Sequence, residues 1–491
     1  MNCCGWICGL KRDTSKAEVN LTDLSQELNA RIFRHLTATD LCHVALCNRI
    51  LRDTANDDAL WRPLCQKKGW ERYGTICDLC KEPPFKPSSQ DQKTGEGGAP
   101  TFPDDVLVTS SDWPGLVDTC KWKEVYMKAR HLEENWRNQR FFAANLLSTG
   151  LSSVAYEGDC LAAGASYSST LEIWDMAREK RQHLIQLDIS GYPGALQMED
   201  GIIAAGCKDG KIRTYSAQTG EQLQVMSGHR LAVSRLFFDG DTIVSVGQYD
   251  IESDDTSRSD IRVWSAVDGV SRCILKSGLE ATNLVHIDYK DKIVAGAYSD
   301  NKIRIWDARN DGSCMQQIVC EMENLISCHL WNGIVIGASK GRIVKQWELK
   351  SGECIKTFDV PLFRGLIQPS QEQSYYVFSD ELLAVVTLFS GLPIVNLNGE
   401  RLLTVDLSDV IPVCFKGRKL LTWSMGAYKL WIIDPVERLD GTAQINSRTA
   451  SQFLGPTHFP CAWMSDIKII FALQMRDSIV DMSSIWVRHY W

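Results

Sequence analysis

Cys77 and Cys80 form a Cys-x-x-Cys pair, a spacing found both in tetrahedral zinc sites and in thiol-disulfide redox centres. A zinc site of this type needs two further ligands, but the nearest cysteines, Cys65 and Cys120, each stand alone without a matching histidine. A redox centre of this type lies in a βαβ unit, and no such pattern surrounds the pair. We therefore interpret Cys77 and Cys80 as unreactive loop thiols and expect no bound metal.

Three more cysteines, Cys3, Cys4 and Cys8, lie beside apolar residues at the start of the chain and are followed by two basic residues. Thioacylation of such cysteines could anchor this end at a membrane. The alternative is an unmodified, flexible terminus spanning residues 1–20. We expect membrane association only if these cysteines are acylated.

We next searched the sequence for the motifs of common catalytic sites. The sequence contains no phosphate-binding glycine loop and no His-Glu-x-x-His zinc motif, and its nine histidines are dispersed. It therefore predicts no catalytic residue and no cofactor. The alternative is a catalytic site assembled from distant loops, which no short motif would reveal.

The composition is that of a globular protein. The chain has 491 residues, of which 44% are hydrophobic and 23% are charged, and its net charge is −8. This balance argues against broad nucleic-acid binding. We find no signal peptide, and no apolar stretch approaches the ~18 residues of a membrane-spanning helix. The eighteen cysteines are scattered through apolar segments, which is typical of free thiols in a reducing compartment, so we expect a cytoplasmic and/or nuclear protein.

A repeat with a period in the low forties dominates the chain after residue 150. Short runs rich in Val and Ile end in an aromatic residue, as in LAAGASYSSTLEIWD and IVAGAYSDNKIRIWD. These runs have the length of strands and lack a helical period. We call the aromatic residues blade anchors. They are Trp174, Tyr215, Trp264, Trp306, Trp347, Trp431 and Trp486, with a weaker one near Phe389.

This pattern resembles the WD-repeat family. The Trp-Asp ending is present at Trp174-Asp175 and Trp306-Asp307, a turn aspartate lies six residues before two anchors at Asp209 and Asp300, and one Gly-His pair stands at Gly228-His229. The resemblance implies a β-propeller built from four-stranded blades.

The number of blades follows from the anchors. Eight anchors predict eight blades, and seven are the alternative if the degenerate unit around residues 366–400 is not a blade. The chain stops soon after the last anchor, which leaves the last blade without an outer strand. We expect the 141–147 segment to supply that strand and to close a propeller spanning residues 141–491.

Residues 21–65 change to a helical period. Apolar residues recur at helical spacing in two stripes, and Thr37 followed by Asp40 predicts a capped start for the second of three helices. This segment resembles the F-box family. The resemblance is carried by Leu24, Glu27-Leu28, Ile32-Phe33, Leu36, Asp40-Leu41 and Asp58 through Trp61. The segment departs from the family at Ser25, where proline is usual, and over Leu46 to Leu51, where an aromatic residue is usual.

Two segments of different character separate these parts. Residues 66–115 are rich in Pro, Gly and Ser and predict a mostly disordered insertion. Residues 116–140 are charged, contain no Pro or Gly, and predict a helical linker. The sequence therefore predicts a multidomain protein with a three-helix F-box, a helical linker and an all-β WD-repeat propeller.

The order of an F-box followed by WD repeats is similar to that of substrate receptors of SCF-type cullin-RING ubiquitin ligases. The resemblance implies that the F-box binds the adaptor subunit, and through it the cullin and RING subunits, while the propeller binds an unknown substrate protein. The adaptor-binding residues that it implies are Leu24, Leu28, Ile32, Phe33, Leu36, Leu41 and Trp61. The alternative is a non-degradative scaffold whose F-box-like segment is structural.

Candidate substrate-binding residues are few. Some F-box propellers bind phosphorylated degrons through an arginine cluster, but we place Ser152, Gly194, Ser234, Val285 and Ser327 at the comparable positions. Only Arg235 and Arg364 lie nearby, so no arginine ring is predicted. The acidic loop 248–260, with Asp254 and Asp255, would favour basic partners, or else is a solvated insertion. Our candidates are Arg235, Arg364, Asp254 and Asp255.

Overall fold

The architecture comes from a computed structural model of the whole chain. The structure describes residues 21–74, 120–138 and 142–489, the last range with gaps at 150, 166–168, 177, 179, 189–190, 192, 248–258, 277–281, 361–373, 380–381, 388–391, 406–410, 418, 425–426, 433–445, 449–460, 465–467 and 478–479. These residues divide into two compact units, one made of residues 21–74 and 120–134 and the other of residues from 135 onward. Each unit is described by itself below.

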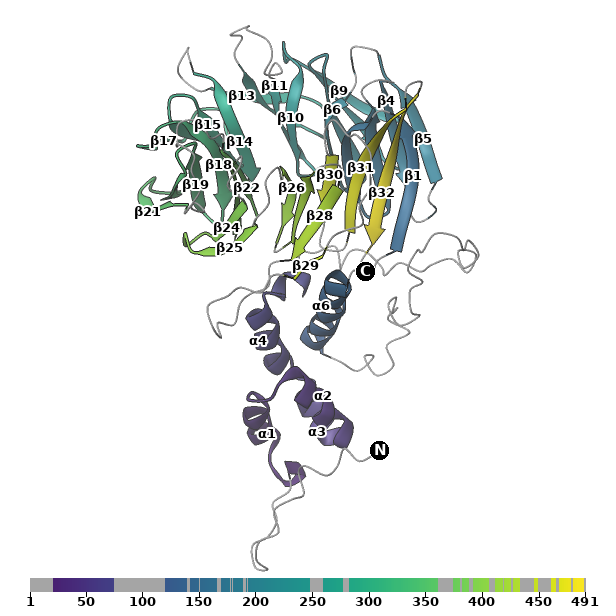
Figure 1. Cartoon of the computed structure of the whole chain (residues 1–491), viewed down its shortest axis with the longest axis vertical. Coiled ribbons are helices and arrows are strands. Elements are labelled where there is room, and N and C mark those ends of the chain that lie inside the picture. The colour runs from purple at the N-terminus through teal and green to yellow at the C-terminus, as the bar shows by residue number, and fades with distance from the viewer. Residues whose placement is uncertain are drawn as a thin grey trace, which may run out of the picture. The chain divides into compact units, whose positions relative to one another are not determined.

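The first unit is helical (Figure 1). Its elements are η1 (Leu21–Asp23), α1 (Gln26–Phe33), α2 (Ala38–Cys47), α3 (Arg49–Ala55), α4 (Asp58–Lys68), η2 (Glu71–Gly74) and the greater part of α6 (Lys121–Asn138). The capping box predicted for the second helix is present, because Thr37 and Asp40 exchange hydrogen bonds between side chains and backbone. Asp57 caps α4 in the same way, accepting a hydrogen bond from the N–H of Ala59.

The prediction of three helices in this segment was wrong at one point. Asn48 has an extended backbone, with φ of −155°, and its side chain accepts a hydrogen bond from the N–H of Ile50. The residue therefore ends α2 and caps a new helix, α3. The apolar stripe that runs from Leu41 to Leu51 is shared by two short helices, so residues 26–68 form four helices in place of three.

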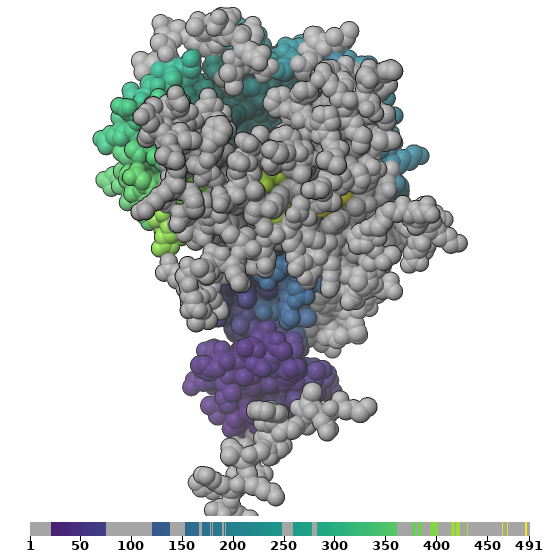
Figure 2. Space-filling view, in the orientation of Figure 1, coloured from purple at the N-terminus to yellow at the C-terminus, as the bar shows by residue number. Residues whose placement is uncertain are grey.

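The core of this unit is closed by residues distant in sequence. Trp61 is fully buried and donates a hydrogen bond of 2.7 Å from Nε1 to the carbonyl of Ala55. Tyr126 of α6 packs edge-on against the ring of Trp61, with 5.4 Å between ring centroids. The N–H of Trp122 donates to Asp58 Oδ1 at 2.8 Å. Figure 2 shows residues 21–74 in purple as a continuous cluster of side chains.

The second unit consists of eight four-stranded antiparallel sheets among its described residues, which confirms the prediction of eight blades. Blade 1 consists of β2 (Leu151–Glu157), β3 (Cys160–Ala165), β4 (Thr170–Asp175) and β5 (Lys180–Gln186), and blade 2 consists of β6 (Pro193–Glu199), β7 (Ile202–Cys207), β8 (Lys211–Ser216) and β9 (Gln222–Ser227). Blade 3 consists of β10 (Val233–Phe238), β11 (Thr242–Gly247), β12 (Asp260–Ser265) and β13 (Ser271–Leu275), and blade 4 consists of β14 (Leu284–Lys290), β15 (Ile293–Tyr298), β16 (Lys302–Asp307) and β17 (Gln316–Val319). Blade 5 consists of β18 (Leu325–Trp331), β19 (Ile334–Ser339), β20 (Ile343–Glu348) and β21 (Cys354–Asp359), and blade 6 consists of β22 (Ser374–Phe378), β23 (Leu382–Thr387), β24 (Leu392–Asn396) and β25 (Arg401–Val405). Blade 7 consists of β26 (Ile411–Lys416), β27 (Lys419–Ser424), β28 (Ala427–Ile432) and β29 (Asn446–Arg448), and blade 8 consists of β30 (Cys461–Met464), β31 (Lys468–Asp477), β32 (Val480–His489) and β1 (Phe142–Thr149).

The eighth blade joins the two ends of the unit. Its outer strand is β1, which pairs antiparallel with β32 from Phe142 opposite His489 to Thr149 opposite Met482. The two strands lie side by side in Figure 1, β1 in blue and β32 in yellow. On the inner side, β30 contacts both β26 of blade 7 and β2 of blade 1, so the sheets close into a ring.

The blades stack on one another through apolar faces. The second strand of each of the first five blades is buried along almost its whole length, because both of its faces are covered by neighbouring sheets. Ile173 of blade 1 and Ile203 of blade 2, for example, belong to one shared core cluster. This packing explains why the runs read as continuously apolar rather than alternating.

We expect Trp61→Ala to destabilise the helical unit by about 3–5 kcal/mol, because it opens a cavity and removes the hydrogen bond to Ala55. The control is Ile50→Ala, which removes a half-exposed side chain and should cost about 0.5 kcal/mol or less. Hydrogen exchange of α1–α4 in the full-length protein measures both effects. Equal protection in the two variants would contradict the assignment of Trp61 to the core.

Candidate functional site

The apolar residues implied as an adaptor-binding set divide into surface and core. Leu28 and Ile32 lie one turn apart on α1, and their side chains are 47% and 43% exposed. Leu24 and Leu36, at the two ends of α1, are half-buried. We call these four residues the α1 patch. An exposed pair of large aliphatic side chains on one helix is a common mark of a protein-binding surface.

The remaining three residues of that set lie inside the helical unit. Phe33, Leu41 and Trp61 are buried, and all three belong to its main core cluster. A side chain that is already covered by its own domain cannot contact a partner directly. Their contribution to any partner binding is therefore to support α1 and its neighbours.

Two further exposed aliphatic residues were not in the predicted set. Leu46, near the end of α2, is 76% exposed, and Ile50, at the start of α3, is 49% exposed. Both belong to the stretch in which the sequence departs from the usual F-box pattern. The signal that could have found them is an apolar residue placed outside the i, i+3, i+4 stripe that forms the core.

The departure at Ser25 has a local physical role. Ser25 is the N-cap of α1, and its hydroxyl accepts a hydrogen bond from the N–H of Leu28 at 3.4 Å. A proline at this position could not supply that acceptor. Ser25 therefore fixes the start of the helix that presents the α1 patch.

The blade anchors are structural residues wherever their side chains are described. Trp174, Tyr215, Trp264, Trp306 and Trp347 are all buried on the third strands of blades 1 to 5. Trp431 and Trp486 lie on β28 and β32, the equivalent third strands of blades 7 and 8. Phe389 lies outside the described residues. The period of the anchors therefore marks the third strand of each blade.

A hydrogen-bonded network in blade 3 resembles a catalytic triad. The Nδ1 atom of His229 lies 2.5 Å from Asp260 Oδ1, and its Nε2 atom lies 2.6 Å from the hydroxyl of Ser245. Ser245 is fully buried, however, and its hydroxyl also accepts a hydrogen bond of 2.7 Å from Trp264 Nε1. Because no substrate can reach this hydroxyl, the network holds the blade together and does not provide a nucleophile.

The charge state of Asp260 fits this structural role. Burial alone would raise the pKa of Asp260, but hydrogen bonds from His229 and Arg262 outweigh it and lower the pKa. The carboxylate therefore stays ionised in the folded blade. In blades 2 and 4 the turn aspartates have a different partner, since Asp209 binds Arg213 and Asp300 binds Arg304 in ion pairs of 2.6 and 2.7 Å.

The segment Gly337 to Gly341 has the spacing Gly-x-Ser-x-Gly, which is also that of the nucleophile elbow of α/β-hydrolases. The segment comprises the end of β19 and the start of the turn to β20, so a strand and not a helix follows it. Its serine, Ser339, is buried, and its hydroxyl accepts a hydrogen bond of 3.2 Å from the N–H of Ile343. The structural context of a nucleophile elbow is therefore not met.

The inner strands each contain a bulge. The position of this bulge shows that one residue in our alignment of candidate phosphate-binding positions was misplaced. Pairing with the second strand skips one residue in β2, β6, β10, β14, β18 and β26. The skipped residue in blade 5 is Ile326, so the position that we gave to Ser327 belongs to Ile326. Arg235 occupies the next position in blade 3 and aligns with His286 and Ser327 of the following blades.

Polar groups connect these inner strands. His329 Nδ1 lies 2.8 Å from Asp288 Oδ2, and the N–H of Cys328 donates to His286 Nδ1 at 3.4 Å. Burial, and after it the positive charge of Arg235, lower the pKa of His286 to about 4, although Asp288 opposes the shift. His286 is therefore neutral near pH 7. Of the predicted substrate-binding residues, Arg235 is exposed on β10, whereas Arg364, Asp254 and Asp255 lie outside the described residues.

Comparison with known proteins follows the same division of the chain. A family model described as F-box-like matches residues 26–67. The "Probable E3 ubiquitin ligase complex SCF subunit sconB" of Aspergillus fumigatus is 26% identical over 223 residues, which cover 35% of this chain and 32% of that protein. The "F-box/WD repeat-containing protein pof1" of Schizosaccharomyces pombe is 25% identical over 216 residues, which cover 36% and 35%. The aligned part thus spans about a third of these curated relatives.

A solved structure is similar in fold to a large part of the chain. The crystal structure of the computationally designed Ika8 protein has a TM-score of 0.51 and 18% identity to this chain, and the match covers 69% of this chain and 96% of that one. At this identity the likeness concerns the fold. The chain is therefore similar to F-box/WD-repeat proteins, with an F-box-like segment over residues 26–67 and eight four-stranded sheets among its described residues.

Two predictions concern other residues outside the described ranges. They are the acylation of Cys3, Cys4 and Cys8 and the inert role of Cys77 and Cys80. Within the described ranges, no helix is long and apolar enough to cross a membrane.

We expect Ser245→Ala to destabilise the propeller by about 1–3 kcal/mol, because it leaves buried nitrogens of His229 and Trp264 without a partner. Denaturant unfolding of the full chain measures this effect. Ser227→Ala, at an exposed position on β9, serves as the control and should change stability by about 0.5 kcal/mol or less. Labelling of Ser245 by a fluorophosphonate reagent would instead support a nucleophilic role.

His286 should make the propeller less stable in mild acid. The unfolded chain binds a proton near pH 6.5 and the folded chain only near pH 4, so stability falls as the pH drops between these values, by up to about 3 kcal/mol. His286→Gln should remove this part of the pH dependence, as measured by thermal unfolding from pH 7 to pH 4.5. His35→Gln, in the helical unit, should leave the propeller transition unchanged. An unaltered profile for His286→Gln would refute the assignment.

Proposed function

We propose that this protein is the substrate-recognition subunit of an SCF-type ubiquitin ligase. The F-box binds the adaptor subunit of the ligase, and the propeller binds the substrate protein. The observation that supports this proposal most directly is the F-box-like match over residues 26–67 followed by a propeller of four-stranded sheets. The similar proteins include one named as an SCF subunit and one named as F-box/WD repeat-containing.

The surface of the helical unit supports the proposed adaptor contact. The α1 patch exposes Leu28 and Ile32, which the core of the unit does not need. Burying the exposed half of each side chain at an interface contributes about 1 kcal/mol each. We therefore assign adaptor binding to the α1 patch, with Leu46 and Ile50 as a second exposed group.

The proposed mechanism involves no chemistry by this chain. Holding a substrate on the propeller and the ligase on the F-box raises the effective concentration of a substrate lysine near the charged ubiquitin-conjugating enzyme. The cullin and RING subunits are then indirect partners, reached through the adaptor. In this role the protein acts as a non-catalytic receptor.

We propose that the protein acts in the cytoplasm or the nucleus. Twelve cysteines in the described part of the chain are free thiols. Burial raises the pKa of Cys160 and of Cys207 to about 11, so these thiols stay protonated and unreactive at neutral pH. This state is typical of proteins in a reducing compartment.

The double substitution Leu28→Asp/Ile32→Asp should weaken capture of the SCF adaptor by about hundredfold or more, because each unpaired carboxylate buried at the interface costs about 1–3 kcal/mol or more. The measurement is biolayer interferometry between the full-length chain and the purified adaptor. Both positions are exposed in the free protein, so folding should be retained.

The matched control is Leu184→Asp/Val319→Asp, which places two charges on exposed positions of the propeller. This variant should capture the adaptor as the wild type does. Absence of binding by the wild type, or equal binding by the Leu28→Asp/Ile32→Asp variant, would refute the proposal. The first result would favour a scaffold whose F-box-like segment is structural.

A further inference from the structure

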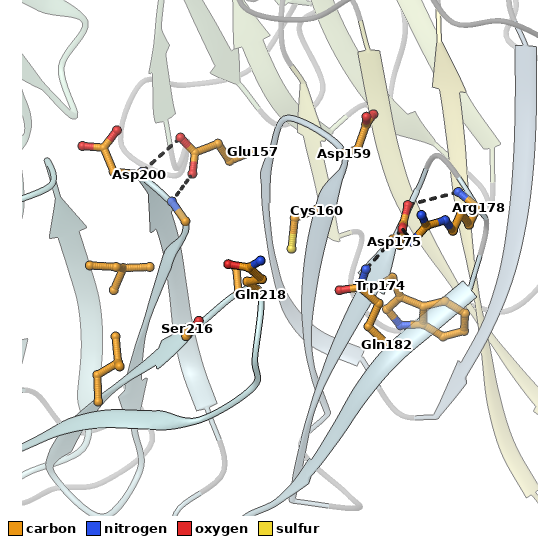
Figure 3. Close-up of a pocket in the computed structure, with 14 residues that line it drawn as sticks. Glu157, Asp159, Cys160, Trp174, Asp175, Arg178, Gln182, Asp200, Ser216 and Gln218 are labelled. Atoms are coloured by element: carbon orange, nitrogen blue, oxygen red, sulfur yellow. Dashed lines mark hydrogen bonds and ion pairs between the residues drawn. The ribbon is translucent and has the colours of Figure 1, made fainter.

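A groove of about 710 Å³ lies between blades 1 and 2, and none of the predicted substrate-binding residues lines it. Its walls come from four turns, β2–β3 and β4–β5 of blade 1 and β6–β7 and β8–β9 of blade 2. Figure 3 shows the side chains that line it, with Glu157 and Asp200 on one side and Asp175 and Arg178 on the other. Its volume falls within the usual range for ligand-binding clefts.

Carboxylates dominate the charge of the groove. Glu157, Asp159, Asp175 and Asp200 line it together with a single cation, Arg178. Two of the four carboxylates have partners. Asp175 pairs with Arg178 at 3.2 Å, and Glu157 accepts hydrogen bonds from the backbone N–H groups of Asp200 and Gly201.

The other two carboxylates are available to a ligand. Asp159 and Asp200 are exposed, and neither side chain has a hydrogen-bond or ion-pair partner among the described residues. Carboxylate oxygens of Glu157, Glu199 and Asp200 lie within 4.8 Å of one another, which concentrates negative potential at this rim. The hydrogen bonds from the backbone of the β6–β7 turn hold the Glu157 carboxylate in place at the edge of the groove.

The same groove also contains apolar surface. Leu223 of β9 is 45% exposed although it lines the groove, and Ile202, Ala217 and Trp174 lie around it. Leu223 contributes to no core cluster of the described residues. A half-exposed leucine beside free carboxylates fits a ligand that has both an aliphatic and a cationic part.

We propose that this groove binds a short basic segment of a partner protein. Basic side chains of the segment pair with Asp159 and with Asp200, and an adjacent aliphatic or aromatic side chain packs on Leu223 and Ile202. Charge complementarity selects this occupant, since the groove is acidic and the whole chain carries a net charge of −8, which steers basic partners towards it. That the bound protein is a ubiquitination substrate rests on the proposed function, whereas the binding itself does not.

The test is a selection of phage-displayed random dodecapeptides on the immobilised full-length chain. The selected peptides should be enriched in Arg or Lys next to a large apolar residue. A synthetic copy of the most enriched peptide should bind the Asp200→Asn/Leu223→Ser variant about tenfold or more weakly than the wild type, because a charge-assisted hydrogen bond and an apolar contact are lost. Its affinity for the wild type should also fall as salt is added.

The two test positions are chosen so that the fold is retained. Asp200 has φ of +52°, in the left-handed region that asparagine tolerates, and Leu223 is on an outer strand. The matched control is Asp291→Asn/Val319→Ser, because Asp291 occupies the equivalent turn of blade 4 with φ of +52° and Val319 is exposed on the outer strand β17. The control variant should bind the peptide as the wild type does.

Three results would overturn the proposal: selection of no peptides, selection without enrichment of basic residues, or equal affinity of the test variant and the wild type. Adaptor capture by the Asp200→Asn/Leu223→Ser variant is measured in parallel and should be unchanged. A chain that captures the adaptor but selects no basic peptide refutes the groove alone. A chain that selects basic peptides but captures no adaptor supports the groove and refutes its assignment to ligase substrates.

Discussion

The antiparallel pairing of β1 with β32 holds together the two ends of the propeller, and the arrangement of the other blades depends on it. All eight residues of β1 pair with β32, which would otherwise present an edge strand of ten residues. The ring then brings β30 against β2, so every blade has a neighbour on both sides. Burial of the second strands and the existence of grooves between blades both follow from this closure.

The helical unit has one set of apolar residues in its core and another set at its surface. Phe33, Leu41 and Trp61 stabilise the unit from inside, and α6 completes this core through Trp122 and Tyr126. Leu28 and Ile32 remain at the surface, where their exposure serves no purpose in the isolated unit. A small helical unit that exposes two large aliphatic side chains is suited to bind another protein through them.

The sequence was sufficient to predict the blades but not the sites. Trp174, Tyr215 and Trp306 recur at one strand position, so their period predicted the propeller. Helical spacing placed Phe33 beside Ile32, but only the tertiary neighbours of α1 decide which of them is buried. Those neighbours include α3, about 20 residues away in the chain, which no local pattern connects with α1.

Two other features were hidden for similar reasons. The bulge that moves Ile326 into the position assigned to Ser327 adds one residue to the inner strand without a sequence signal of its own. The acidic groove joins Asp159 with Asp200 and Leu223, which come from two different blades. Only the stacking of the blades brings these residues together.

We propose that α1 is the surface by which the protein binds the SCF adaptor. Hydrogen exchange of the full-length chain, with and without saturating adaptor, tests it most directly. We predict new protection in residues 24–36, with a smaller effect in residues 46–50 and none in blades 1 to 5. Protection confined to the propeller, or no change in residues 24–36, would contradict the account.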